Sequence, residues 1–193
     1  GFPSQRREEA RSRQRALDAL ALVGLAEQAD LPAASLPYGQ QRLVEIARAL
    51  AAEPRLLLLD EPAAGMNAGE REDLVERIAN IRAAGVTVLL VEHDIDLVMD
   101  ISDAVNVLDY GKLIASGTPD VVKKDQAVIT AYLGVERKEA DLCTTRDLLE
   151  GRCEEMLVVQ DLVTAYGNIE ALHGVSLLVP KGQVVAVLGA NGA

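Results

Sequence analysis

The sequence predicts an α/β fold with a parallel sheet, and two patterns carry that prediction. Short apolar runs that suit strands alternate with longer stretches of helical periodicity. Acidic or basic side chains directly follow two of these runs, "RLLLLDE" at 55–61 and "VTVLLVEH" at 86–93. Because a parallel sheet gathers the carboxyl ends of its strands at one edge, we expect a ligand site at that edge.

The first part of the chain is expected to be helical. An Arg-rich start leads into a helix over 4–29, with a break near Gly24. The stretch "DLPAASLPYG" at 30–39 predicts a loop, because it contains two prolines. A second helix is expected from Gly39 to about Ala52, with one apolar stripe.

Strands and helices then alternate. The continuous apolar runs at 55–60 and 86–92 are typical of strands that are buried on both faces. A helix over 68–84 lies between them, and a shorter one over 94–102 follows. The stretch "AVNVLDYGKLIASG" at 104–117 predicts two strands joined by a tight turn.

The chain changes character after a short helix expected over 126–133. Residues 135–155 have high charge density and weak apolar periodicity, and they predict a linker. Both cysteines, Cys143 and Cys153, fall in it and fit reduced thiols rather than a disulfide framework. Strand patterns then return in "MLVVQDLVTAY", "ALHGVSLLV" and "GQVVAVLG".

Charge and hydropathy exclude several classes of function. The chain of 193 residues has 19 basic and 30 acidic side chains, a net charge of −11, which disfavours nucleic acid as a partner. No apolar run approaches the roughly 18 residues that span a bilayer. We therefore expect any membrane association to go through a partner protein.

The run "LLLLDEP" places Asp60 and Glu61 together at the end of a strand. In a nucleotide hydrolase an Asp at this point holds Mg²⁺, and an adjacent Glu polarises the attacking water. The alternative is a polar turn whose acids cap the next helix. His93, at the end of a second strand, is able to hydrogen-bond a γ-phosphate, whereas an isolated histidine is more often a surface or satisfied core residue.

The order of these segments resembles that of the ATP-binding cassette (ABC) ATPases, which have a P-loop NTPase fold. "LPYGQ" stands where the family has its LSGGQ signature, followed by "LLLLDEP" at the Walker B position, "AAGMN" at the D-loop and the switch histidine in "VEHD". "LPYGQQRLVEIARALAAEPRLLLLDEPAAGMN" is similar to the branched-chain amino acid importer subfamily, and the resemblance continues through residue 134.

The resemblance implies a role for each matching residue, with ATP and Mg²⁺ as cofactors. Asp60 would hold the metal, Glu61 would act on water and His93 would contact the γ-phosphate. The signature would close over the nucleotide of a second cassette. The signature residues are Leu36, Pro37, Tyr38, Gly39 and Gln40, and the D-loop residues are Ala64, Gly65, Met66 and Asn67.

The sequence departs from the family pattern at two places. Pro37 and Tyr38 replace the usual Ser and first Gly of the signature, so a hydroxyl contact to the γ-phosphate is lost and backbone donors near Gly39 must compensate. Asn67 replaces the usual Asp of the D-loop, which keeps an oxygen able to cap a helix but removes the charge.

The last segment resembles the start of a second cassette. Tyr166 matches the aromatic residue that stacks on adenine, although a strand-end aromatic on a half-exposed face is the alternative. The front of a Walker A loop is matched by Gly189, Ala190, Asn191, Gly192 and Ala193.

These matches predict three segments: the C-terminal part of one cassette at 1–134, a linker at 135–155, and the start of another cassette at 156–193. We prefer this division to a single permuted cassette, since the Walker A Lys-Ser/Thr pair occurs nowhere in the sequence. We therefore expect a fragment of a fused tandem ATPase, cut at both ends, that has no appreciable ATPase activity alone.

The resemblance implies an ATPase subunit of an importer of branched-chain or similar apolar amino acids, peripheral on the cytoplasmic face of the inner membrane. Its partners would be membrane permease subunits, a second cassette and, indirectly, an extracytoplasmic substrate-binding protein. The Arg-rich helix over 4–29 would belong to the subdomain that meets the permease. The alternatives are a soluble ABC ATPase that acts on ribosomes or DNA, and an inactive fragment.

Overall fold

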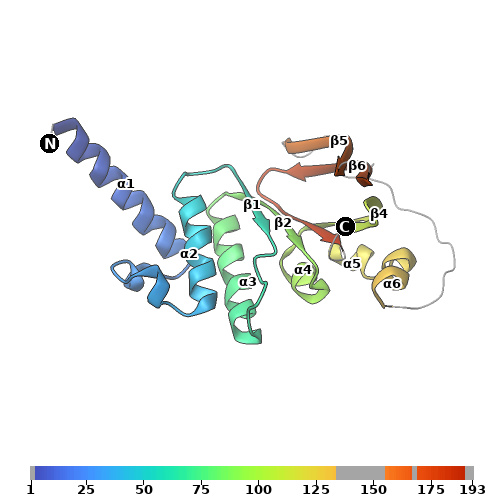
Figure 1. Ribbon diagram of the computed structural model, residues 1–193, viewed down its shortest axis with the longest axis horizontal. Helices are drawn as coiled ribbons and strands as arrows, with labels where there is room; N and C mark the ends of the chain where they lie inside the picture. Colours follow the sequence, from blue (N-terminus) through green and yellow to red (C-terminus); the bar gives the residue numbers. More distant parts are fainter. Residues whose placement is uncertain (1–2, 134–154, 167–168, 190–193) are drawn as a thin grey trace. The chain divides into compact units, whose positions relative to one another are not determined.

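The computed structural model describes residues 3–133, 155–166 and 169–189, and its helices and strands are drawn in Figure 1. Its contacts divide the chain into two units. The first contains Gly1–Leu57 and Pro62–Val86, and the second contains Leu58–Glu61 and Thr87–Ala193. The cut between the units differs from the boundary at residue 134 that the sequence predicts, and the division into two cassettes stays a prediction.

The first unit is helical. Its elements are α1 (Pro3–Leu22), the short 3₁₀ turns η1 (Ala26–Gln28) and η2 (Ala33–Ser35), α2 (Tyr38–Leu50) and α3 (Ala68–Ala83). The first helix ends at Leu22, earlier than expected. The break at Gly24 is confirmed, since its φ of 75° is a left-handed conformation that glycine adopts without strain.

The three helices of the first unit share an apolar core. Residues that point inward recur at helical spacing, so each helix contributes one buried stripe. The deeply buried members include Val23 of the turn after α1, Ile46 of α2, and Leu74, Ile78 and Ile81 of α3.

A five-stranded sheet and three helices form most of the second unit. The strand order is β1-β2-β7-β3-β4, and Leu56 and Leu57 of β1 lie in the first unit. The strands are β1 (Leu56–Asp60), β2 (Thr87–Glu92), β3 (Ala104–Asp109), β4 (Lys112–Gly117) and β7 (Val184–Gly189). The helices are α4 (Ile95–Ile101), α5 (Pro119–Val122), which the sequence did not indicate, and α6 (Gln126–Leu133).

The strand β7 lies in the middle of this sheet. It pairs in parallel with β2, with Glu92 opposite Leu188, and in parallel with β3, with Leu108 opposite Gly189. Its first five residues are buried. The strand β7 belongs to the predicted segment 156–193, yet it pairs within the sheet whose other strands come from the predicted segment 1–134. A single permuted cassette would also have this arrangement.

The expectation that β1 is buried on both faces is wrong. Leu58 is 64% exposed, and burial along β1, which is an edge strand, alternates. In β2, Val91 is 41% exposed, so continuous burial fails there too. Continuous burial occurs instead in β7 and β3, in which the first five residues of each strand are buried.

A second, two-stranded sheet pairs β5 (Glu155–Tyr166) with β6 (Ile169–Pro180). Val175 of β6 packs against Leu108 of β3 and Val187 of β7 in one apolar cluster. His173 N donates to the Gly111 carbonyl of the β3–β4 turn at 3.0 Å. The predicted linker at 135–155 lies outside the described residues except for Glu155, and so do Cys143 and Cys153.

Candidate functional site

Two strands of the second unit end at the residues that the sequence singled out. Asp60 is the last residue of β1 and Glu61 follows it, while His93 follows β2. Glu61 N donates to the Val91 carbonyl at 2.9 Å, which continues the pairing of these strands past Asp60. The chain therefore presents two carboxylates and an imidazole at one edge of the sheet, as parallel strands favour.

Glu61 has a backbone conformation that is unusual for a residue with a side chain. Its φ is 41°, in the left-handed region. A non-glycine residue in this region costs on the order of 1 kcal/mol, and such residues concentrate at functional sites. A turn at residues 62–65 follows directly after Glu61.

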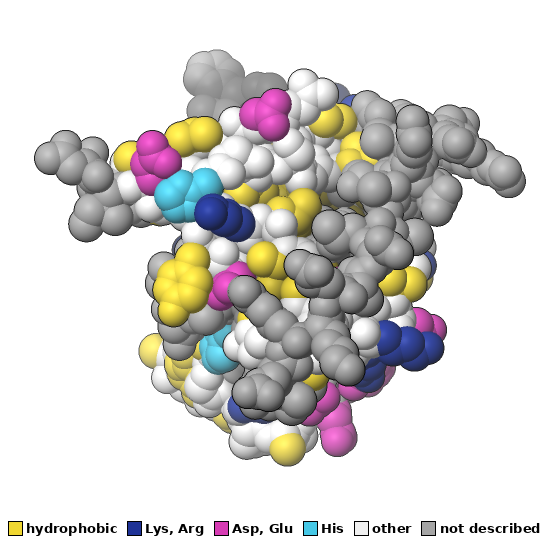
Figure 2. All heavy atoms as spheres, turned by 90° about the vertical axis from the view of Figure 1, so that its right-hand side faces the viewer, with side chains coloured by type: hydrophobic (Ala, Val, Ile, Leu, Met, Phe, Trp, Pro, Cys, Tyr) yellow, Lys and Arg dark blue, Asp and Glu magenta, His cyan; other side chains and the backbone are white. Residues whose placement is uncertain are grey.

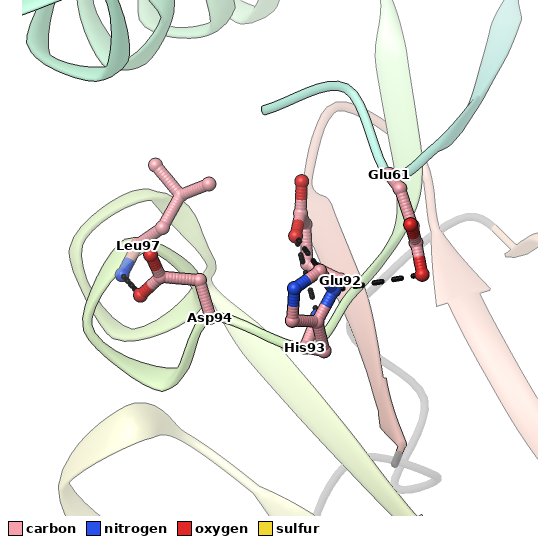
Figure 3. A network of polar contacts seen from close by, with 5 residues as sticks. All are labelled: Glu61, Glu92, His93, Asp94 and Leu97. Atoms are coloured by element: carbon pink, nitrogen blue, oxygen red, sulfur yellow. Dashed lines mark hydrogen bonds and ion pairs between the residues drawn. The ribbon is translucent and has the colours of Figure 1, made fainter. Parts of the chain in front are cut away.

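Glu61 and His93 approach each other, as Figure 3 shows. His93 Nδ1 lies 3.5 Å from Glu61 Oε1, and the two side chains are 44% and 43% exposed. Figure 2 shows histidine side chains, in cyan, open at the surface of the face in view. The pair is held loosely and stays accessible to solvent and to a ligand.

Glu92 is a buried carboxylate beside this pair, and the sequence analysis did not select it. Its side chain is 1% exposed, and its Oε2 accepts a hydrogen bond from His93 N at 3.2 Å. Asp94 caps the following helix by accepting from Leu97 N at 3.2 Å (Figure 3). The direction of the chain at His93 is thus fixed by an acid on each side.

The donor set at this edge fits Mg²⁺ and a nucleotide phosphate. The described residues contain no cluster of three or more His, Cys, Asp or Glu side chains that would form an all-protein metal site. Mg²⁺ does not need such a cluster, because it is bound by one or two carboxylates together with phosphate oxygens and water. Asp60, which is exposed, is suited to supply such a carboxylate.

The strand β7 brings Gly189 to the same edge of the sheet. Leu188 is opposite Glu92, so Gly189 is one residue past this pair, as His93 is on β2. The other residues of the predicted phosphate loop, Ala190, Asn191, Gly192 and Ala193, lie outside the described residues. Tyr166 is the last residue of β5, and its predicted contact with adenine stays a prediction.

The predicted signature residues form the start of α2 in the first unit. Leu36 is buried, Pro37 is the residue before the helix, and Tyr38 and Gly39 begin it. The Gln41 side chain donates to the Leu36 carbonyl at 2.8 Å and so closes the turn. Gln40 follows in the first turn of the helix, where backbone N–H groups have no partner within the helix.

The predicted D-loop residues lead into α3. Asn67 caps this helix: its Oδ1 accepts from Glu70 N at 3.1 Å, and Glu70 Oε2 accepts from Asn67 N at 2.9 Å. The side-chain oxygen of Asn67, which the usual Asp would also have, therefore caps the helix, as the sequence predicted. Ala64, Gly65 and Met66 form the preceding turn.

The signature and D-loop residues contact each other within the first unit. Gly39 N donates to Glu70 Oε1 at 3.3 Å, and a Cβ built on Gly65 would lie 3.0 Å from the Tyr38 ring. The Tyr38 hydroxyl accepts from Arg42 Nε at 3.1 Å. The hydrogen bonds of Arg42 to Glu45 and then to Tyr38 raise the pKa of its guanidinium above the usual value.

Glu70 is a contact residue that the sequence analysis missed. A signal for its local role exists, because Asn followed by Glu three residues later is the pattern of a capping box. No sequence pattern indicates the hydrogen bond with Gly39, which is 31 positions away.

Two family models match the chain. The model of the ABC transporter family matches residues 2–64, and that of the branched-chain amino acid ATP-binding cassette transporters matches residues 112–138. The high-affinity branched-chain amino acid transport ATP-binding protein LivG of Escherichia coli K12 is 46% identical over 133 residues, which are 68% of this chain and 52% of LivG. BraF of Pseudomonas aeruginosa, which has the same description, is 48% identical with the same coverage.

A similar fold occurs in the ADP conformation of MJ1267, an ATP-binding cassette of an ABC transporter. The TM-score is 0.58 with 33% identity, covering 63% of this chain and 50% of MJ1267. The chain spans about half the length of the relatives it matches. Taken with the strand-end residues and the capped helices, these matches show that this chain is similar, over about two thirds of its length, to the ATP-binding cassettes of ABC transporters.

Proposed function

We propose that this chain is part of an ATP-binding subunit that energises the uptake of branched-chain or similar apolar amino acids through a membrane permease. The observation that carries the proposal is the identity of 46–48% to LivG and BraF, proteins that are described as branched-chain amino acid transport ATP-binding proteins. The match of residues 112–138 to the branched-chain subfamily supports the same substrate class.

The chemistry of the sheet edge supports ATP hydrolysis. Glu61 would orient and polarise the attacking water, and His93, 3.5 Å from it, would contact the γ-phosphate. Asp60 would hold Mg²⁺, which neutralises phosphate charge when it is bound. The first turn of α2, residues 38–40, would offer backbone N–H groups to the phosphate of a nucleotide that a second cassette holds.

The predicted second nucleotide site belongs to this proposal. Tyr166 would stack on adenine, and Gly189–Ala193 would begin the loop that cradles the phosphates. Residues 156–193 would then open a second cassette that is joined to the first by residues 135–155. The subunit would be peripheral, with permease subunits as partners. No helix in the described ranges is long and apolar enough to cross a membrane.

Uptake into proteoliposomes tests this function. The transporter that contains this chain should accumulate radiolabelled leucine only when ATP is supplied on the side of the subunit. Asp60→Asn should abolish both uptake and hydrolysis, since an amide binds Mg²⁺ weakly. Glu72→Gln removes a charge from an exposed position of α3 and should leave both unchanged. ATP hydrolysis that no apolar amino acid transport accompanies would contradict the proposal.

A further inference from the structure

We propose that Glu70 is a positioning residue: its carboxylate fixes the start of α2, residues 36–40, relative to the turn at 64–67. The proposal rests on the proposed function in one respect, that both turns act on a bound nucleotide. The geometric link itself is independent of that function and is tested separately.

The carboxylate of Glu70 has a different backbone partner on each oxygen. Oε2 accepts from Asn67 N at 2.9 Å, and Oε1 accepts from Gly39 N at 3.3 Å. Asn67 Oδ1 in turn accepts from Glu70 N at 3.1 Å, which caps the backbone at the start of α3. One side chain thus joins two segments that are 31 positions apart in the sequence.

The Gly39 N–H needs a partner of this kind. It belongs to the first turn of α2, in which the first helical hydrogen bond runs from Gln41 N to the Pro37 carbonyl at 3.0 Å. The N–H groups before it have no acceptor within the helix. Glu70 is a negative charge at the N-terminal ends of both α2 and α3, where the partial positive charge of each helix favours an anion.

Close packing shows that the two segments are fitted to each other. A Cβ at position 39 would lie 2.6 Å from Glu70 Oε1 and 2.9 Å from Glu70 Cγ, so Gly39 makes room for this side chain. One residue earlier, the Tyr38 ring lies against Gly65. Two successive residues of α2 therefore meet two places in the segment around the predicted D-loop.

A capping role alone does not account for these contacts. The capping box explains the hydrogen bonds between Asn67 and Glu70, since both belong to the start of α3. It does not explain why the second carboxylate oxygen reaches Gly39 on another helix. A Glu that only capped α3 would require no glycine at position 39.

Amide exchange measured by NMR on the full chain tests the link directly. In Glu70→Ala the Gly39 amide should exchange about tenfold faster, because its acceptor is lost. Glu70→Asp, which is shorter by one methylene and keeps the charge, should give the same result if it cannot span both partners. Glu70→Gln keeps only one acceptor oxygen, because its NH₂ group cannot accept, and should protect either the Gly39 or the Asn67 amide but not both.

Asn67→Ala is the matched control for loss of the cap. It removes the acceptor of Glu70 N but leaves the Glu70 carboxylate with Gly39, so exchange should rise at Glu70 and not at Gly39. Unchanged Gly39 exchange in both Glu70→Ala and Glu70→Asp would overturn the link, whatever the chain does with ATP.

Steady-state hydrolysis by the assembled transporter tests the consequence for the nucleotide. Displacing the start of α2 should weaken nucleotide capture, so the KM for ATP should rise about five- to tenfold in Glu70→Ala, with kcat within about twofold. Glu70→Gln, which keeps one of the two acceptor oxygens, should give a KM between those of the wild type and Glu70→Ala, and Glu72→Gln should not change it. A Glu70→Ala enzyme with wild-type KM would refute the positioning role. A wild-type transporter without ATPase activity would instead refute the proposed function and leave the exchange result standing.

Discussion

Glu61 follows strand β1 and Glu70 lies in the first turn of α3, and their surroundings differ in a way that separates two tasks. Both oxygens of the Glu70 carboxylate accept hydrogen bonds from backbone N–H groups, at 2.9 and 3.3 Å. Glu61, at the edge of the sheet in the other unit, has a side chain that is 43% exposed and a contact of 3.5 Å with His93.

This difference shows how the surroundings of a carboxylate suit it to a structural role or to a catalytic role. A carboxylate whose acceptor positions are used by the backbone is held in place and has little capacity left for a reactant. A carboxylate with one loose neighbour keeps its lone pairs available, and Glu61 also sits in a strained backbone conformation. Four predictions test this contrast, from the largest expected effect to the smallest.

The same substitution, Glu to Gln, should lower the rate of ATP hydrolysis strongly at position 61 and only slightly at position 70. Glu61→Gln removes the group that polarises water, and we expect hydrolysis to fall about a hundredfold or more. Glu70→Gln changes a side chain that bonds only backbone N–H groups within the first unit, and hydrolysis at saturating ATP should stay within about threefold. Single-turnover measurements with saturating ATP would compare the two variants. Similar losses in both would remove the distinction between them.

For stability, the order of importance of the two glutamates should be reversed: removing the Glu70 carboxylate should cost more than removing that of Glu61. Glu70→Ala loses a helix cap and the hydrogen bond from Gly39, and should lower the free energy of unfolding by about 1–2 kcal/mol. Glu61→Ala removes an exposed contact and should change it by no more than about 0.5 kcal/mol. Urea unfolding followed by circular dichroism measures both. A stability loss in Glu61→Ala that equals that of Glu70→Ala would contradict the contrast.

The effect of a methyl group at position 39 should depend on Glu70. In the wild-type chain, Gly39→Ala places a Cβ against the Glu70 carboxylate and should destabilise by about 1 kcal/mol. In the Glu70→Ala background the same change should stabilise by about 0.5 kcal/mol, because alanine favours a helix more than glycine does. A double-mutant cycle gives this coupling, and strict additivity would exclude the contact in solution.

The backbone strain at Glu61 predicts the smallest effect. Glu61→Gly should raise the free energy of unfolding by about 0.5–1 kcal/mol, since glycine adopts a φ of 41° without a steric penalty. The same variant should not hydrolyse ATP. Thermal unfolding of Glu61→Gly beside Glu61→Gln isolates the backbone effect from the loss of charge.

Much of the fold was predictable, because its signals are local. The strand-end positions of Asp60, Glu61 and His93 follow from apolar runs that are five or six residues long. The cap at Asn67 follows from one side-chain oxygen. Both depend on residues that are neighbours in the chain, which a sequence pattern detects.

The parts that escaped prediction depend on residues far apart in the chain. The hydrogen bond between Gly39 and Glu70 joins two helices, and no periodicity records it. The exposure of Leu58 on β1 and of Val91 on β2 depends on which sheet residues other elements cover, and an apolar run does not record this. The pairing of β7 with β2 also links residues almost a hundred positions apart, such as Val88 and Val184.

The central position of β7 has a consequence for synthesis of the chain. The facing edges of β2 and β3 both pair with β7, so these two edges lack this partner until residues 184–189 have left the ribosome. Unpaired edges of apolar strands are templates for aggregation, and pairings between distant residues form slowly. A chaperone that binds nascent chains should therefore crosslink to β2 and β3 until residue 189 emerges, and release them once β7 has closed the gap.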